Sequence, residues 1–334
     1  MKMYENKYHE IDIENKNFLI TGGAGFIGSH IVAYLMKHNA GKVRVLDNLI
    51  TGNYMNIQQW ESHPNFEFIE GDITDTATCL HACAGIDYLS HQAALGSVPR
   101  SIKDPVRSNA INVDGFLNMM IAAKESKIKK VVYASSSSVY GSEASLPKFE
   151  DKIGDPLSPY AVTKYTNELY AKVFGTTYNM KIIGLRYFNV FGPRQDPNGP
   201  YAAVIPIFID KLKSKTPVYI DGDGEQTRDF TFVENAVQAN IRAMLTSNEE
   251  ASNQVYNIAF GENYSVNYLY NSIRESLGST QDAIHRASRE GDVRNSLADI
   301  SKARKLLGYQ PLFSFKDGLP ITIESYLKAG ASDI

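Results

Sequence analysis

The stretch FLITGGAGFIGSHIVAYL, residues 18–35, decides the fold, because an apolar run, a glycine-rich turn and an amphipathic helix pattern follow one another in it. Gly22, Gly25 and Gly28 stand three residues apart. Glycine lets the backbone turn tightly and approach a pyrophosphate, which the N-terminus of the following helix holds through free N–H groups and its dipole. The stretch predicts a strand, a phosphate-binding turn and a helix, although alone it is also compatible with a purely structural turn.

Short runs rich in β-branched residues alternate with helical patterns through the first half of the chain. A strand, a helix and a further strand in succession require parallel pairing with crossover helices, so the fold class is α/β with a doubly wound parallel sheet. Ligands of such sheets bind at the carboxyl ends of the strands. The predicted strands lie in residues 17–23, 42–48, 66–72, 86–94, 129–141 and 180–188.

After residue 188 the alternation gives way to loops rich in Gly, Pro, Asn and Asp, before the helix pattern VENAVQANIRAML and the strand pattern NQVYNIAF indicate a return to the sheet. The sequence therefore predicts a nucleotide-binding domain of residues 17–188 plus 229–259. A smaller, discontinuous domain for the substrate is predicted in residues 189–228 plus 260–334, and residues 1–16 form an N-terminal extension. A ligand cleft is expected between the two domains.

Two carboxylates follow predicted strands of the sheet. Asp47 ends the strand VRVLDN, nineteen residues after Gly28. A carboxylate there accepts hydrogen bonds from ribose hydroxyls and repels a 2′-phosphate, which favours NAD over NADP. Asp72, at the end of the next strand, is placed either to contact the adenine or to cap a helix.

The stretch LSPYAVTKY, residues 157–165, places Tyr160 and Lys164 four residues apart on one helical face. An ammonium beside a phenol stabilises the phenolate and lowers its pKa, so this tyrosine is a candidate base near neutral pH. Ser136, in the serine cluster YASSSSVYG, lies upstream at the end of a predicted strand and is placed to donate a hydrogen bond to the same substrate oxygen. Isolated pairs and serines of this kind are commonly structural, but together with the glycine turn and Asp47 they indicate a catalytic site.

These motifs resemble the extended short-chain dehydrogenase/reductase superfamily over essentially the whole chain, and within it the NAD-dependent nucleotide-sugar 4-epimerases. The stretches HQAALGSVPRS, SSSSVYG, LRYFNVFGPRQDPNGPYAAVIP and GDGEQTRDF are most similar to bacterial UDP-N-acetylglucosamine 4-epimerases of surface-polysaccharide pathways. The resemblance implies a Rossmann domain, NAD as cofactor and a UDP-sugar as substrate. It also implies a homodimer that pairs helices near residues 104–126 and 158–175.

The resemblance assigns a role to each matching residue. The implied catalytic residues are Ser136, Tyr160 and Lys164. The implied NAD-binding residues are Gly22, Gly25, Phe26, Ile27, Asp47, Asn48, Asp72, Ile73, Ala93, Tyr160, Lys164 and Tyr187. The implied substrate-binding residues are Gly96, Ser97, Ser136, Ser137, Ser138, Asn189, Ala203, Val204, Tyr219, Arg228, Arg289, Asp292 and Ser296.

The implied reaction is an oxidation and re-reduction of the sugar. Tyr160 takes the proton of the 4-hydroxyl while NAD takes the hydride from the same carbon, and the 4-keto sugar rotates before the hydride returns. A 4,6-dehydratase or decarboxylase is the nearest alternative, but dehydratases carry an Asp-Glu pair where this chain has Ser137 and Ser138. A non-catalytic NAD-sensing regulator is a more remote alternative, and it would not need the Tyr-Lys pair.

The sugar is expected to carry an acetamido group. In the family a large aromatic residue after the Gly-Asp of the C-terminal domain disfavours N-acetyl groups, and here that place holds the small Ser296. UDP-GlcNAc and UDP-GalNAc are therefore the expected pair, with UDP-glucose or a UDP-uronate left open. A uronate needs a cation near the sugar C6, for which Arg100 and Lys103 are the candidates.

The composition narrows the setting in which the protein works. The chain has 334 residues, 43% of them hydrophobic and 21% charged, and a net charge of −3, which argues against bulk nucleic-acid or anionic-membrane binding. Without a signal-peptide or membrane-spanning run, the expected location is cytoplasmic. The only two cysteines, Cys79 and Cys83, read as small buried helix residues, and no metal site is expected.

Overall fold

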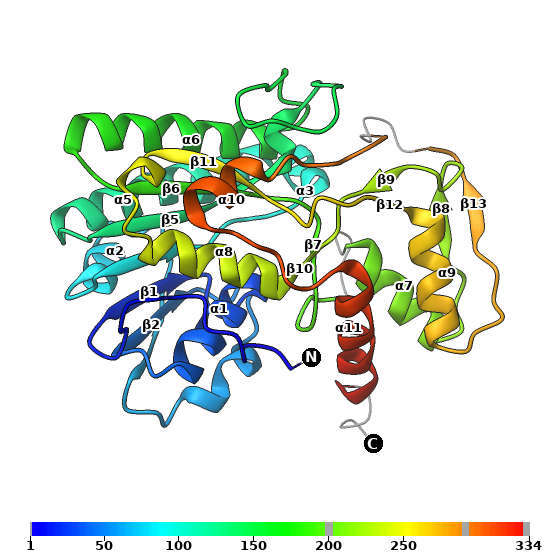
Figure 1. The fold of residues 1–334 in the computed structure, drawn as a ribbon, viewed down its shortest axis with the longest axis horizontal. Coiled ribbons are helices and arrows are strands. Elements are labelled where there is room, and N and C mark those ends of the chain that lie inside the picture. The colour runs from blue at the N-terminus through cyan, green and yellow to red at the C-terminus, as the bar shows by residue number, and fades with distance from the viewer. Residues whose placement is uncertain (1, 198–202, 289–293, 330–334) are drawn as a thin grey trace.

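The computed structural model describes residues 2–197, 203–288 and 294–329. At its centre is a parallel sheet of seven strands in the order β11-β6-β5-β4-β1-β2-β3 (Figure 1). The doubly wound α/β fold class is thereby confirmed, and each of the six strands predicted in the first half lies inside its predicted range. The strands are β1 (Asn17–Thr21), β2 (Lys42–Asp47), β3 (Phe66–Glu70), β4 (Tyr88–His91), β5 (Lys130–Ser136), β6 (Ile182–Tyr187) and β11 (Gln254–Ile258).

The chain winds in both directions from the middle of the sheet. β1 pairs in parallel with β2 on one side and with β4 on the other. The successive strands β2 and β3 then extend one half, and β5 and β6 extend the other. The carboxyl ends of β1 and β4 therefore flank the point at which the strand order reverses, where doubly wound sheets bind their ligands.

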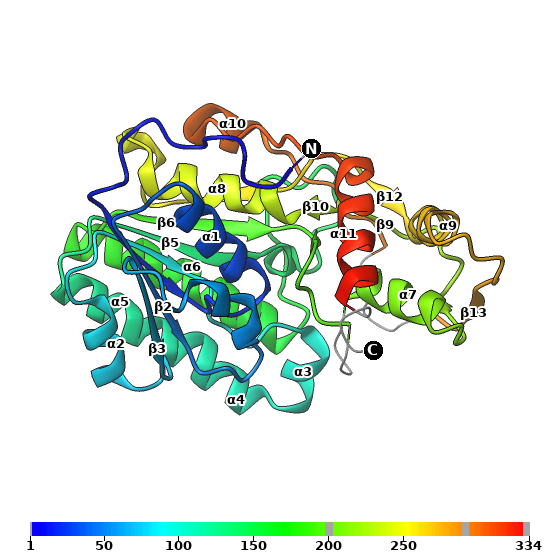
Figure 2. The same ribbon diagram turned by 90° about the horizontal axis from the view of Figure 1, so that it is seen from below.

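Helices cover both faces of this sheet (Figure 2). One core lies between the sheet and the helices α1 (Phe26–Lys37) and α8 (Val233–Leu245), and it includes Ile31 and Val237. The opposite core contains Phe116 and Phe174 and is closed by α2 (Thr76–Cys83), α5 (Gly115–Glu125) and α6 (Pro159–Tyr178). Cys79 and Cys83 are free and fully buried in α2, as the sequence indicated. Short helices, α3 (Val98–Lys103), α4 (Pro105–Asn109) and the π-helical turn η3 (Ala110–Asp114), precede α5.

A smaller lobe lies beside the sheet and has an apolar core of its own (Figure 1). Its helices are α7 (Val204–Lys213), α9 (Val266–Ser276) and α11 (Phe315–Ala329). The strand pairs of this part of the chain are β7 (Val190–Phe191) with β10 (Thr231–Phe232), β8 (Tyr219–Asp221) with β13 (Ile284–Arg286), and β9 (Thr227–Arg228) with β12 (Tyr264–Ser265). The chain enters this lobe after β6 and returns through α8 to β11, which pairs with β6.

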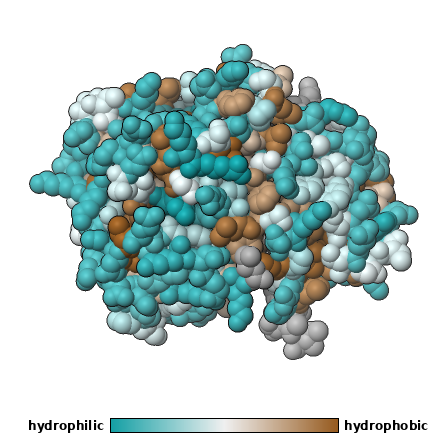
Figure 3. Space-filling view, in the orientation of Figure 1, coloured by the Kyte–Doolittle hydropathy of each residue, from teal (hydrophilic) through white to brown (hydrophobic). Residues whose placement is uncertain are grey.

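The domain boundaries drawn from the sequence stay a prediction, and one segment crosses them. Residues 298–309, which include α10 (Ser301–Leu307), were assigned to the smaller domain, but Ile300, Leu307 and Tyr309 are buried in the core beneath the large sheet. The face that carries α8 and α10 is mostly hydrophilic, and its apolar residues form small patches (Figure 3). Within the described ranges, no helix is both long and apolar enough to cross a membrane.

The N-terminal segment, residues 2–16, is packed against α1 and α8. Its Tyr8 is 4% exposed and stacks on Tyr34 with ring centroids 5.2 Å apart. The Tyr8 hydroxyl donates to Glu234 Oε1 at 2.7 Å, and the Tyr4 backbone N–H donates to the same oxygen at 2.8 Å. The Tyr4 hydroxyl also contacts His30, whose other ring nitrogen lies 2.9 Å from the Pro193 carbonyl oxygen. The segment thus connects α1 with α8, and His30, which it contacts, in turn contacts Pro193 at the entry to the smaller lobe.

Tyr8→Phe should lower the free energy of unfolding by about 1–3 kcal/mol, because a buried carboxylate loses a hydrogen-bond donor. Glu234 Oε2 already has no partner among the described residues, so the second oxygen does not compensate. Urea unfolding of the wild type and the variant measures the difference. Tyr268→Phe, at a residue with 40% exposure, is the matched control, and equal stability of Tyr8→Phe and the wild type would show that the contact adds nothing.

Candidate functional site

The glycine turn after β1 packs too closely for side chains at two of its positions. Gly22 has φ +67°, and a Cβ built there would lie 2.7 Å from the Ala93 backbone nitrogen. A Cβ on Gly28 would lie 2.1 Å from the Gly22 carbonyl oxygen. The turn therefore needs glycine at both positions, and it leads directly into α1, whose N-cap is Gly25. The free N–H groups at this helix end are placed to bind an anion.

A cavity of about 250 Å³ opens at this turn, between the ends of β1 and β4. It brings together most of the predicted dinucleotide contacts, from the glycine turn to the catalytic helix. Its lining includes Gly22, Gly25, Phe26, Ile27, Asp47, Asn48, Ile73, Ala93, Tyr160, Lys164 and Tyr187. Gly96, which the resemblance assigned to the substrate, also lines this cavity and not the second one. A glycine cradle, a carboxylate at the end of β2 and a largely apolar lining fit NAD.

Asp47 is held in place by backbone donors at the wall of this cavity. Its oxygens accept from the Ala24 N–H at 3.0 Å and the Leu49 N–H at 2.9 Å. Burial raises the pKa of the Asp47 carboxyl, and these hydrogen bonds oppose that rise. Asp72 does not itself line the cavity; it accepts a 2.8 Å hydrogen bond from Asn48, which does. Asp72 is thus positioned to orient Asn48.

Tyr160 stands at the junction of this cavity with a second one. The second cavity has a volume of about 370 Å³ and lies between the serine cluster after β5, the start of α6 and the segment around residue 296. The serine cluster forms η4 (Ser137–Tyr140), with Ser136 as its N-cap. Ser158 caps α6 by accepting from the Ala161 N–H, which fixes the turn that carries Tyr160. The predicted residues Ser97, Ser136, Ser137, Ser138, Tyr160, Asn189, Arg228 and Ser296 all line this second cavity.

The electrostatics of the pair differ from the sequence-based expectation. Desolvation raises the pKa of Tyr160, and the lowering contribution comes from a hydrogen bond with Ser136 and not from Lys164. The reason is geometric. Lys164 Nζ donates to the Ala134 carbonyl oxygen at 2.9 Å and lies 5.9 Å from the centroid of the Tyr160 ring. Desolvation lowers the pKa of Lys164 to about 8, so the side chain is still mostly an ammonium at neutral pH.

Tyr187 is fixed by two polar residues that sequence reasoning did not identify. Its hydroxyl donates to Gln92 Oε1 at 3.1 Å and accepts from Asn240 Nδ2 at 2.7 Å. Gln92 lines the first cavity, at the glycine turn, whereas Asn240 is buried on α8. No local pattern marks Asn240, because its contact with β6 exists only after α8 has folded back onto the sheet.

A third cavity, of about 290 Å³, lies in the smaller lobe. Among the residues predicted to hold UDP, Asn189, Val204, Tyr219 and Arg228 line it, and Ala203 is the N-cap of α7. Asn189 and Arg228 also line the second cavity, so they join the two. The lining includes two cations that were missed, Lys211 and Arg286, and Arg286 pairs with Asp221. Arg289 and Asp292 lie outside the described residues.

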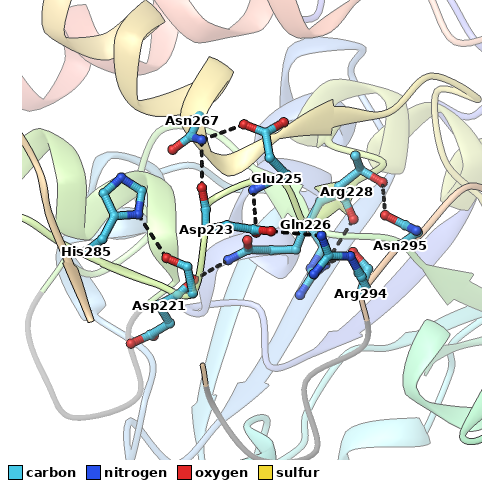
Figure 4. Close-up of polar contacts among 11 residues, drawn as sticks. Asp221, Asp223, Glu225, Gln226, Arg228, Asn267, His285, Arg294 and Asn295 are labelled. Carbon is cyan, nitrogen blue, oxygen red and sulfur yellow. Dashed lines mark hydrogen bonds and ion pairs between the residues drawn. The ribbon is translucent and has the colours of Figure 1, made fainter. Parts of the chain in front are cut away.

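A hydrogen-bonded loop network shapes this end of the site (Figure 4). Gln226 Nε2 donates to the Asp221 carbonyl oxygen at 2.8 Å, and Arg294 donates to Asp223 at 2.9 Å. Arg228 donates to the carbonyl oxygens of Thr227 and Arg294 at 2.9 and 3.3 Å. These contacts tie the segment 221–228 to the segment 294–296, which carries Ser296. The wall between the nucleotide end and the sugar end is thereby built from two distant parts of the chain.

The comparisons with known proteins agree on one family. The sequence profile described as the NAD dependent epimerase/dehydratase family matches residues 18–259. A Methanocaldococcus jannaschii protein, whose name places it with the UDP-glucose 4-epimerases, is 42% identical over 304 residues, which are 90% of this chain and 95% of that protein.

Two solved structures extend the comparison. The UDP-N-acetylglucosamine 4-epimerase from Methanobrevibacter ruminantium, solved with UDP-N-acetylmuramic acid, has a TM-score of 0.89 and 41% identity, and the match covers 94% of this chain and 99% of that one. The Thermus thermophilus UDP-glucose 4-epimerase, solved with NAD, has a TM-score of 0.83 and 32% identity, with the same coverage of 94% and 99%.

Proposed function

Because this chain belongs to the NAD-dependent epimerase/dehydratase family and is an enzyme of the UDP-sugar 4-epimerase kind, we propose that it interconverts UDP-GlcNAc and UDP-GalNAc. One observation carries the proposal: Tyr160 lines both the cavity that fits NAD and the cavity beside the serine cluster. A single phenol oxygen at that junction is positioned to reach the carbon that exchanges a hydride. Such epimers would serve as precursors for polysaccharide synthesis.

The proposed mechanism assigns a proton step to the protein. Tyr160 takes the proton of the sugar 4-hydroxyl and returns it after the 4-keto sugar has rotated. Ser136 donates a hydrogen bond to the same sugar oxygen. Lys164 lines the first cavity and is placed to bind the cofactor. The residues of the first cavity would hold NAD, which would supply a reversible hydride acceptor for the sugar carbon. Arg228, with Arg286 and Lys211 nearby, is suited to the diphosphate, because guanidinium groups bind phosphate oxygens in a bidentate manner.

The composition of the second cavity disfavours a dehydratase. Elimination of water needs an additional acid and base, yet the described residues that line this cavity include no Asp or Glu. Ser137 and Ser138 occupy the positions in question, and hydroxyls do not perform that proton transfer at neutral pH. UDP-glucose and UDP-uronates stay as alternative substrates of the same chemistry. The cytoplasmic location likewise stays a prediction from the sequence.

The function is tested with purified protein and no added cofactor. UDP-GlcNAc is incubated with the protein, and the formation of UDP-GalNAc is followed by chromatography, together with UDP-glucose and UDP-glucuronate as parallel substrates. We expect the highest kcat/KM for UDP-GlcNAc. A stronger preference for either of the other two would replace the proposed substrate, and absence of any epimer would support the NAD-sensing regulator instead.

Ser296→Tyr should impair UDP-N-acetylhexosamines more than UDP-hexoses, because the larger ring fills the part of the second cavity into which the 2-substituent would fit. We expect kcat/KM for UDP-GlcNAc to fall about tenfold to a hundredfold relative to kcat/KM for UDP-glucose. The tyrosine ring would displace the acetamido group of UDP-GlcNAc, whereas UDP-glucose has no such group to displace. Ser296→Ala is the matched control, because it keeps the space. Equal losses for both substrates would remove the gate role of Ser296.

A homodimer is proposed from the apolar residues that α6 and its neighbours expose. Val162, Leu169 and Val173 on α6 are about half exposed, and Val106 on the adjacent α4 is 78% exposed. Such a surface is typical of helix pairing between subunits. The double substitution Val106→Glu, Val173→Glu should convert the dimer to a monomer in analytical ultracentrifugation, whereas Met55→Glu, at another exposed site, should not. A monomeric wild type would contradict the proposal.

A further inference from the structure

We propose that Lys148 recognises the 2-acetamido group of the substrate by donating a hydrogen bond from its ammonium to the acetamido oxygen. The inference rests on the proposed function and names a residue that selects N-acetylhexosamines positively, whereas Ser296 only leaves room for them. It starts from the place of Lys148 in the second cavity, which it lines together with Ser136, Tyr160 and Ser296.

The backbone of Lys148 is fixed beside the segment that carries Ser296. The Lys148 N–H donates to the Leu297 carbonyl oxygen at 2.8 Å, and the Asp299 N–H donates to the Lys148 carbonyl oxygen at 3.0 Å. Asn257 Nδ2 also donates to this carbonyl oxygen, at 2.9 Å. These contacts place Lys148 opposite Ala298, two residues from Ser296, so its side chain and the proposed gate belong to the same wall of the cavity.

The ammonium has donor capacity that the protein does not use. Lys148 is 5% exposed, and its Nζ donates to the Glu143 carbonyl oxygen. An ammonium carries three N–H donors, so at least one is left for a ligand. Among the residues that the structure describes, Lys148 forms no ion pair with a carboxylate. Burial lowers the pKa of Lys148, and the charge of the Glu143 carboxylate opposes this without reversing it.

A donor of this kind discriminates more strongly than space alone. A roomy pocket binds a substrate with or without the acetamido group nearly equally well. A buried donor that is paired by one substrate and left unpaired by the other separates them by orders of magnitude. Lys148 therefore provides the energetic preference for the acetamido group. The small residue at position 296 provides the space that this group needs.

The other cations considered for the sugar lie elsewhere. Arg100, expected from the sequence as a cation for a uronate, lines a separate hollow of about 180 Å³ next to Ile50, Thr51 and Arg107. Lys103 lines none of the cavities described above. Arg228 lines the second cavity but also the third cavity, where it would bind a diphosphate. Lys148 is thus the lysine at the sugar end.

The test compares two variants on two substrates. Lys148→Met keeps the length of the side chain and removes the donor, and Lys148→Arg keeps a charged donor. We expect Lys148→Met to lower kcat/KM for UDP-GlcNAc by about tenfold to a hundredfold and that for UDP-glucose less than about threefold. Lys148→Arg should recover part of the loss. The content of bound NAD should stay at the wild-type value. Lys148→Arg keeps a donor for the Glu143 carbonyl oxygen, so its unfolding midpoint should lie closer to that of the wild type than the midpoint of Lys148→Met.

Binding measurements separate this inference from the proposed function. Isothermal titration with UDP-GlcNAc, UDP-glucose and UDP-glucuronate reports the same preference even in a protein that does not turn them over. The wild type could fail to turn over any substrate and yet bind UDP-GlcNAc more tightly than UDP-glucose, with a difference that depends on Lys148. That result would overturn the epimerase proposal and support the inference. Equal losses for both substrates would overturn the inference and assign Lys148 a structural role, and a loss confined to UDP-glucuronate would overturn it in favour of a carboxylate contact.

Discussion

Tyr160→Phe is expected to lower kcat by about a hundredfold to ten-thousandfold, because the variant has no group at the junction of the two cavities that can take the proton of the sugar. The ring keeps its packing, so KM and the bound NAD should change little. Initial rates give kcat, and absorbance of the denatured protein's extract gives the NAD content. A loss in kcat and kcat/KM by the same factor would identify an interaction made only in the transition state.

Tyr178→Phe is the matched control, since it removes a hydroxyl from the other end of the same helix, where the side chain is exposed. It should keep wild-type activity.

The wild-type rate should fall as the pH is lowered, because the pKa of Tyr160 is raised by desolvation and a base must be deprotonated to act. A Tyr160→Phe variant within a factor of a few of the wild type would contradict the role of Tyr160.

Gly28→Ala is expected to abolish NAD binding at micromolar concentrations. A Cβ at this position would lie 2.1 Å from the Gly22 carbonyl oxygen and 2.9 Å from the Gly23 Cα, so the backbone of the turn would have to move. The N–H groups that are placed to hold a pyrophosphate would move with it. NAD content of the purified protein, and titration after removal of the cofactor, measure the effect.

Gly85→Ala is the control for the cost of a side chain in a turn. Gly85 has φ +72° but no atom within 4 Å of a built Cβ, so alanine there costs about 1–2 kcal/mol of stability without a clash. It should bind NAD like the wild type. If Gly28→Ala retained NAD equally well, the glycine turn would not be the pyrophosphate site.

The sequence predicted the sheet and the centre of the site because both depend on local patterns. Most strands of the first half carry their own run of β-branched or aromatic residues, and the glycine turn is bounded by a strand and a helix. The pair Tyr160 and Lys164 needs only helical spacing, and Ser136 needs only the end of a strand. In a doubly wound sheet these ends meet at one edge, so local signals are sufficient to bring the residues together.

The rest of the site depends on contacts between distant segments, and no local pattern reports these. Lys148 lies near Ser296 only because its segment pairs with Ala298, two residues further along the chain than Ser296. Arg286 enters the third cavity through the pairing of β13 with β8. The expected effect of Lys164 on the pKa of Tyr160 was wrong for a related reason, since helical spacing gave the face but not the carbonyl of Ala134 that binds the ammonium.

The contact between Tyr8 and Glu234 has a consequence for biosynthesis. The partners are 226 residues apart, so during translation the first residues wait roughly 10–45 s for α8 at synthesis rates of about 5–20 residues per second. Until then the Tyr8 hydroxyl lacks its carboxylate acceptor, and only the stacking of its ring on Tyr34 is possible. Docking of this segment is therefore completed late, when α8 brings Glu234 to the Tyr8 hydroxyl.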